Sequence, residues 1–93
     1  QNLPNVYGKD AEYYFNDFQK LLKLNNFNLN IISSYYFFQI NRWDIVTNNQ
    51  KIIKFPSKGL TEAIRVVNKL LNNKNFSNYS VIDLRINNKI ITQ

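Results

Sequence analysis

The chain has 93 residues, which is enough for one domain with a modest hydrophobic core and too few for two. It contains no cysteine and no histidine, which excludes disulfides, thiol chemistry and the usual nitrogen and sulfur ligands of zinc. The formal net charge of +6 comes mainly from single lysines spread along the chain, so we expect it to keep an aromatic-rich domain soluble.

The first predicted elements are an irregular entry and a helix. Leu3, Pro4 and Gly8 indicate an extended segment followed by a turn, because proline blocks regular pairing and glycine supplies unusual backbone angles. Residues 11–24 place apolar side chains at helical spacing, which predicts an amphipathic helix. The Asn-rich segment 25–30 is predicted to end this helix and form a loop.

Three strands are predicted in the middle of the chain from their β-branched and aromatic content: residues 31–40, 42–47 and 51–55. In the first of them, Tyr36 and Phe38 share one face while Tyr35 and Phe37 share the other. Because both faces carry aromatic rings, this strand is either covered on both sides or covered on one side and free to bind on the other.

A second helix and a closing hairpin complete the chain. Residues 60–71 again keep the helical spacing of apolar side chains. The strands 81–86 and 89–93 are predicted to pair across the two-residue turn Asn87-Asn88, since asparagine tolerates the positive φ that tight turns demand. If the last strand lies at a sheet edge, its backbone groups are available to a second polypeptide.

Together these elements predict one α+β domain over residues 1–93. The predicted order is helix, three strands, helix, two strands. Both helices are expected to pack on one face of a mostly antiparallel sheet of about five or more strands.

The residue types needed for catalysis are sparse. The six carboxylates are scattered over separate predicted elements, and the two glycines, Gly8 and Gly59, are too far apart to form a phosphate-binding loop. The sequence therefore predicts no enzyme activity and no catalytic, metal or cofactor site.

Nucleic-acid binding is an alternative that the sequence leaves open. Tyr35 and Phe37, flanked by Arg42 and Lys51, could stack bases on a sheet face, as single-strand-binding domains do. Packing beneath the helices explains the same rings equally well. The alternative reading is a basic α+β domain that binds single-stranded nucleic acid through these sheet aromatics.

Several short motifs occur in an order and spacing that cover nearly the whole chain. They are Leu3-Pro4, Gly8 and Ala11, then Arg42-Trp43-Asp44, Ile53, Phe55-Pro56, the helical positions Ala63, Val67 and Leu70, and Ile82-Asp83-Leu84-Arg85. Taken together, this set resembles the membrane-distal β domain of the FtsQ/DivIB family of bacterial cell-division proteins.

The resemblance implies a role and a location. Members of this family carry a short cytoplasmic tail, one transmembrane helix and a small POTRA domain before the β domain, and none of these is expected within this chain. The family acts as a non-enzymatic scaffold of the divisome, on the periplasmic face of the inner membrane at the septum. Its implied partners are FtsB and FtsL, and through them FtsW and FtsI, which synthesise septal peptidoglycan.

The resemblance also implies a binding site at the end of the chain. The partner-binding residues that it indicates are Arg85, Ile86, Asn88, Lys89, Ile90, Ile91, Thr92 and Gln93. FtsB would add a strand to the last strand of the domain by β-augmentation. Arg85 would pair with an acidic residue of the partner, or alternatively with Asp83 or Asp44 inside the sheet.

Overall fold

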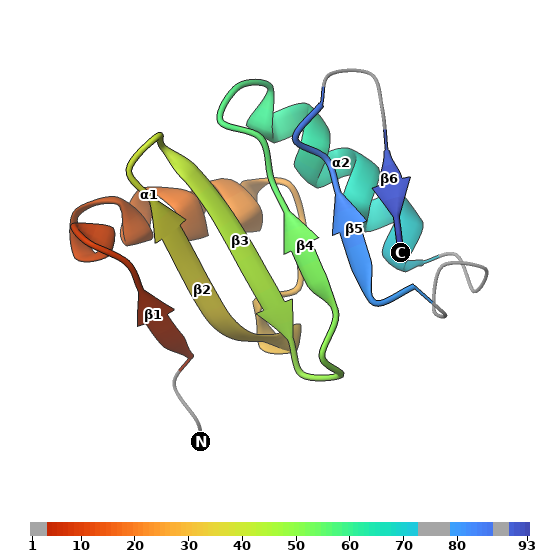
Figure 1. Cartoon of the computed structure of the whole chain (residues 1–93), viewed down its shortest axis with the longest axis horizontal. Helices are drawn as coiled ribbons and strands as arrows, with labels where there is room; N and C mark the ends of the chain where they lie inside the picture. Colours follow the sequence, from red (N-terminus) through yellow and green to blue (C-terminus); the bar gives the residue numbers. More distant parts are fainter. Residues whose placement is uncertain (1–3, 73–78, 87–89) are drawn as a thin grey trace.

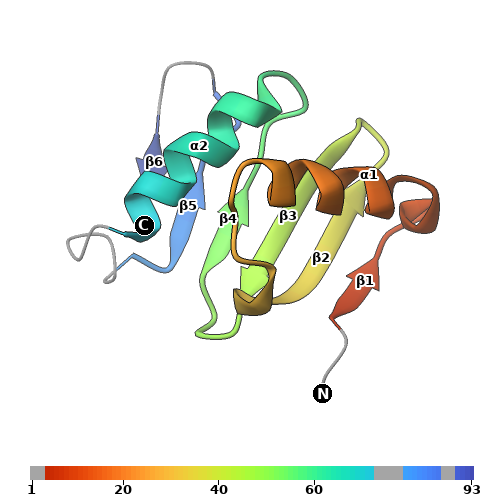
Figure 2. The same cartoon turned by 180° about the vertical axis from the view of Figure 1, so that it is seen from behind.

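The computed structural model describes residues 4–72, 79–86 and 90–93, and arranges them in two layers. The elements are β1 (Asn5–Tyr7), α1 (Ala11–Leu24), the 3₁₀ helix η1 (Leu29–Ile31), β2 (Ile32–Phe38), β3 (Arg42–Thr47), β4 (Ile52–Lys54), α2 (Leu60–Leu71), β5 (Val81–Asp83) and β6 (Ile91–Thr92). Both helices lie on one face of the sheet, as expected, and leave the other face open (Figures 1 and 2).

The sheet has six strands in the order β1-β2-β3-β4-β5-β6. The pairs β2–β3, β3–β4 and β5–β6 are antiparallel, whereas β1–β2 and β4–β5 are parallel. The prediction of a mostly antiparallel sheet is therefore wrong, because the sheet is mixed. The reason lies in the connections: α1 links β1 to β2 and α2 links β4 to β5, and a helical crossover returns the chain in the same direction.

The first strand is absent from the predicted order, which began with a helix. β1 has three residues, too few for an alternating pattern to be recognised, and it lies between Pro4 and Gly8. Gly8 has a φ of +116°, and a Cβ built on it would lie 2.2 Å from the Phe37 carbonyl oxygen. The turn that leads from β1 into α1 therefore requires glycine both for its backbone angle and for its close approach to β2.

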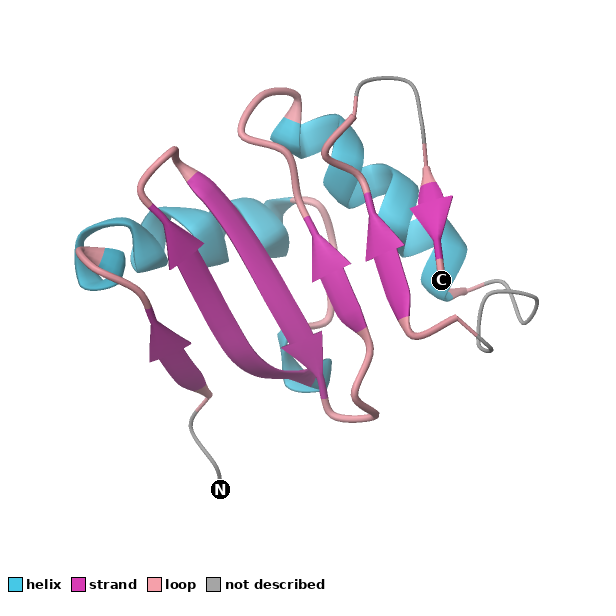
Figure 3. Ribbon diagram, viewed as in Figure 1, coloured by secondary structure: helices cyan, strands magenta, loops and turns pink. Residues whose placement is uncertain are grey.

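The helices agree with their predicted ranges, and the strands are shorter than predicted except for β3. β5 ends at Asp83 and β6 comprises only Ile91–Thr92, so both are drawn as short arrows in Figure 3. The predicted turn Asn87-Asn88 and Lys89 lie outside the described residues.

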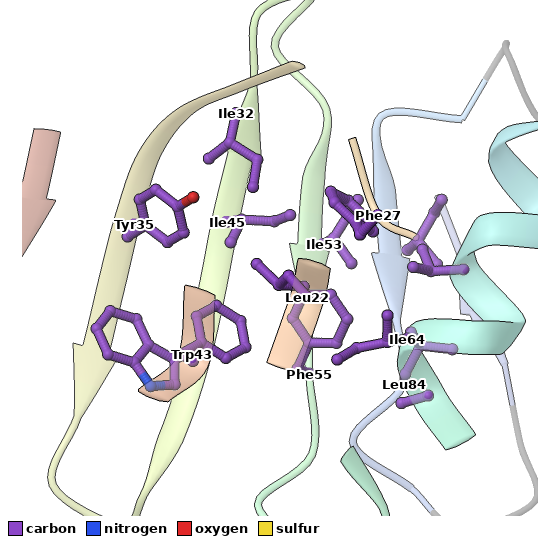
Figure 4. Close-up of a cluster of buried hydrophobic side chains, with 14 of the residues drawn as sticks. Leu22, Phe27, Ile32, Tyr35, Trp43, Ile45, Ile53, Phe55, Ile64 and Leu84 are labelled. Carbon is purple, nitrogen blue, oxygen red and sulfur yellow. The ribbon is translucent and has the colours of Figure 1, made fainter. Parts of the chain in front are cut away.

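The core lies between the sheet and the two helices (Figure 4). Phe18 of α1 stacks on Trp43 of β3 with a ring-centroid distance of 4.9 Å. Other side chains buried in this core include Leu22, Phe27, Tyr35, Ile45, Ile53, Phe55, Ile64, Val67, Ile82 and Leu84. The core therefore spans β2 to β5 and holds both helices against one face of the sheet.

Candidate protein-binding site

β6 is the last strand of the sheet and pairs with β5. Val81 and Gln93 exchange both of their backbone hydrogen bonds, with N···O distances of 3.0 and 3.2 Å. The backbone N–H of Ser80 also donates to the Gln93 carbonyl at 2.6 Å. These bonds anchor the end of the chain to β5 and leave the other side of β6 at the sheet edge (Figure 1).

The hydrogen-bond pattern determines which backbone groups of β6 face outward. In an antiparallel pair, hydrogen-bonded residues alternate with residues whose backbone groups point away from the partner strand. Because Gln93 is hydrogen-bonded to Val81, Thr92 occupies the alternate position opposite Ile82. The N–H and C=O of Thr92 therefore point away from β5, toward the open edge.

The structure brings six of the eight predicted binding residues into the described chain around β5 and β6. Arg85 and Ile86 are exposed just after β5, Ile90 and Gln93 are exposed on either side of β6, and Ile91 and Thr92 are half-buried within it. Asn88 and Lys89 lie outside the described residues.

Arg85 forms an ion pair with Asp83. Its Nε donates to Oδ1 of Asp83 at 2.9 Å and one Nη donates to Oδ2 at 2.6 Å. These hydrogen bonds lower the pKa of Asp83 below its ordinary value, while partial burial acts in the opposite direction. The internal partner of Arg85 is thus Asp83, and 39% of the Arg85 side chain remains exposed.

One row of side chains crosses all six strands on the open face. The strand register aligns Tyr7, Tyr36, Asp44, Lys54, Asp83 and Ile91. Asp44 is buried within this row and lies 3.6 Å from an Nη of Arg42. Burial raises the pKa of Asp44, and the positive charges of Arg42 and Lys54 oppose this effect.

The aromatic rings that suggested base stacking are on the covered face. Tyr35 and Phe37 are 0% and 6% exposed, so of the two explanations left open the structure supports packing beneath the helices, and these two rings are not available to stack bases. Lys51 is also buried, and its Nζ donates to the Tyr79 carbonyl. The rings on the open face include Tyr36, which stacks on Tyr7 at a centroid distance of 4.9 Å. The alternation of side chains along the strand correctly assigned Tyr35 and Phe37 to one face and Tyr36 to the other. It did not indicate which of these two faces the helices cover.

Comparison with known families matches residues 1–85 to the C-terminal domain of the cell division protein FtsQ/DivIB. The chain belongs to the FtsQ/DivIB family. FtsQ/DivIB proteins are membrane-anchored, non-catalytic division scaffolds with an extracellular C-terminal domain. The match ends at Arg85, so β6 lies beyond the part of the chain that carries the FtsQ/DivIB signal.

Two further observations accompany this assignment. No curated protein matches the chain. Among the residues described by the structure, no helix has the length and apolar character needed to cross a bilayer.

Proposed function

We propose that this domain is a divisome scaffold that binds an FtsB-type partner through β6 by β-augmentation. Membership of the FtsQ/DivIB family supports a division scaffold. The observation that carries the finer proposal is the position of β6 at the sheet edge, with the backbone N–H and C=O of Thr92 directed outward. A partner strand would satisfy these groups and extend the sheet.

The side chains of β6 and β5 offer a basis for selectivity. Ile91 lies in the open-face row beside Asp83, whereas Thr92 lies opposite Ile82 on the covered face. A partner strand added to β6 would therefore contact the aliphatic side chain of Ile91 on the open face of the sheet. The partly exposed Arg85 side chain can donate to an acidic partner residue, and a charge-assisted hydrogen bond contributes about 1.5 to 3 kcal/mol.

In this proposal the domain acts on the periplasmic face of the inner membrane at the division septum. FtsL would join through FtsB, and the assembled complex would help to control septal peptidoglycan synthesis by FtsW and FtsI. The domain supplies the docking surface and no catalytic group.

Two single proline substitutions in β6 test whether the partner binds to this edge strand. Thr92→Pro removes an outward N–H that β5 does not use, so we expect the thermal midpoint to change little and the affinity for an FtsB-type peptide to fall about tenfold or more. Ile91→Pro removes an inward N–H and serves as the variant that weakens the β5–β6 pairing itself.

Isothermal titration calorimetry with the peptide gives the dissociation constant, and a thermal melt reports folding. An unchanged dissociation constant for a folded Thr92→Pro variant would place the partner elsewhere on the domain.

A further inference from the structure

A pocket of about 740 Å³ is lined by the C-terminal ends of both helices, the segment that follows α1, and the β3–β4 turn. Figure 2 shows the loop after α1 descending beside this turn on the helix-covered side. The described residues that line the pocket are Asn25, Asn26, Asn28, Ile31, Thr47, Asn48, Asn49, Lys51, Asn68, Leu70, Leu71 and Asn72. Its volume falls within the range typical of small-ligand sites.

The lining has an unusual composition. Of the twelve described lining residues, seven are asparagine, and none is acidic or aromatic. Each asparagine amide offers donors on its nitrogen and acceptor positions on its oxygen, without a formal charge. Most of the polar wall is therefore neutral and can both donate and accept hydrogen bonds.

Hydrogen bonds hold several of these amides in place by one atom each. Nδ2 of Asn68 donates to the Asn25 carbonyl at 2.7 Å and links the ends of the two helices. Nδ2 of Asn48 donates to the Asn30 carbonyl at 2.9 Å, and Oδ1 of Asn49 accepts from the Thr47 hydroxyl at 2.5 Å. The wall is therefore fixed before any ligand binds, which lowers the entropy cost of binding.

The other atom of each of these amides is unused. Within the described part of the chain, Oδ1 of Asn48, Oδ1 of Asn68 and Nδ2 of Asn49 have no hydrogen-bond partner. The cation in the lining, Lys51, donates its Nζ to the Tyr79 carbonyl. These three amides thus keep two acceptor atoms and one donor atom for a ligand, and the described lining contains no carboxylate to select a cation.

We propose that this pocket binds a neutral saccharide. A sugar hydroxyl donates and accepts at the same atom, so it matches an amide wall that presents both functions. The aliphatic side chains of Ile31, Leu70 and Leu71 can pack against the C–H faces of a sugar ring. None of the described lining residues belongs to β5 or β6, so this site is separate from the proposed partner edge.

A titration of the ¹⁵N-labelled chain tests the proposal. The probes are two neutral oligosaccharides, one of glucose and one of N-acetylglucosamine, and an anionic oligogalacturonate of the same length. We expect saturable shifts of the side-chain amide signals of Asn48, Asn49 and Asn68 with at least one neutral sugar and none with the anionic sugar. Absence of saturable shifts, shifts confined to other residues, or equal binding of the anionic sugar would overturn the proposal.

Variants identify the pocket as the origin of the signal. Asn49 and Asn72 are exposed lining residues, and the combined substitution Asn49→Ala with Asn72→Ala should weaken sugar binding about tenfold. Asn16→Ala is the matched control, because Asn16 is an exposed asparagine of α1 outside the lining. Unchanged sugar affinity in the folded double variant would contradict the proposed site.

The same variants separate this site from the proposed partner edge. The double variant should capture the FtsB-type peptide as the unmodified chain does, and Thr92→Pro should leave the sugar titration unchanged. If a folded Thr92→Pro variant lost sugar binding, the proposal that the pocket and the partner edge are separate sites would be contradicted.

Discussion

Two aspartates of the same open-face row have opposite electrostatic environments. Asp83 accepts hydrogen bonds from the Arg85 guanidinium, which lower its pKa. Asp44 is buried, and burial raises its pKa despite the nearby charge of Arg42. Ionisation of Asp83 therefore favours the folded state, whereas ionisation of Asp44 opposes it.

This difference predicts the pH dependence of two variants. The contribution of Asp83 is complete above its unfolded pKa of about 3.9 and is lost as the pH falls through its lower folded pKa. Asp83→Asn should therefore reduce the free energy of unfolding at neutral pH by about 0.5 to 1 kcal/mol, and this deficit should shrink in acid.

Asp44→Asn should behave in the opposite way. The pKa of Asp44 is raised in the folded state above the unfolded value of about 3.9. Acidification from neutral pH therefore protonates the buried carboxylate of the folded state first, which removes the free-energy cost that its charge imposes on folding. The variant should be at least as stable as the unmodified chain at neutral pH, and the difference should narrow in acid. Urea unfolding at a series of pH values measures both, and a larger loss for Asp44→Asn than for Asp83→Asn would contradict this account.

Arg85 links the ion pair to the proposed interface. Arg85→Glu should weaken capture of an FtsB-type peptide by about tenfold or more, because it replaces an exposed guanidinium with a repelling carboxylate. Asp83→Asn is the matched control, since it frees Arg85 from its internal partner and should leave capture equal or stronger. An unchanged dissociation constant for Arg85→Glu would show that Arg85 pairs only with Asp83 and does not contact the peptide.

At the scale of elements, the two glycines precede the two helices but differ in their surroundings. The Cβ of Gly8→Ala would meet the Phe37 carbonyl oxygen at 2.2 Å, whereas a Cβ on Gly59 meets nothing within 4 Å. Gly59→Ala should therefore cost about 1 kcal/mol for its φ of +71°, the ordinary penalty of a left-handed residue.

Gly8→Ala should cost more, about 2 to 4 kcal/mol, because β1 or β2 must shift to relieve the clash. Chemical denaturation of both variants gives the comparison. Equal costs would mean that the turn before α1 is not packed against β2 as described.

Helical spacing of apolar residues predicted both helices, because each helix buries one continuous face. No comparable sequence pattern predicted which strands pair or whether they pair in parallel. β1 is short and β5 ends early, and parallel pairing follows from where the helices cross between strands. The pocket was missed for a related reason. Asparagines in three separate segments are ordinary loop and helix-end residues, and only the fold gathers Asn25, Asn48 and Asn68 around one space.

The candidate edge was predictable in part. The expected tight turn at Asn87-Asn88 predicted a final strand after it, and β6 lies at the sheet edge. The outward direction of the Thr92 backbone depends on the hydrogen bonds between Val81 and Gln93, which no sequence pattern specifies. Similarly, the pairing of Arg85 with Asp83 rather than Asp44 depends on the local geometry after β5.

At the scale of the whole molecule, the sheet formed by the described residues ends in two edge strands, β1 and β6, on opposite sides. Both helices lie on one face of the sheet (Figures 1 and 2). The proposed scaffold function assigns the partner to β6. The two edges can therefore be compared within one protein, with β1 as the internal reference.

Amide hydrogen exchange with and without a saturating FtsB-type peptide tests this assignment most directly. We expect the Thr92 amide to exchange at least about tenfold more slowly in the complex, while the amides of β1 exchange at unchanged rates. An unchanged exchange rate at Thr92 with the peptide bound would contradict strand addition at β6.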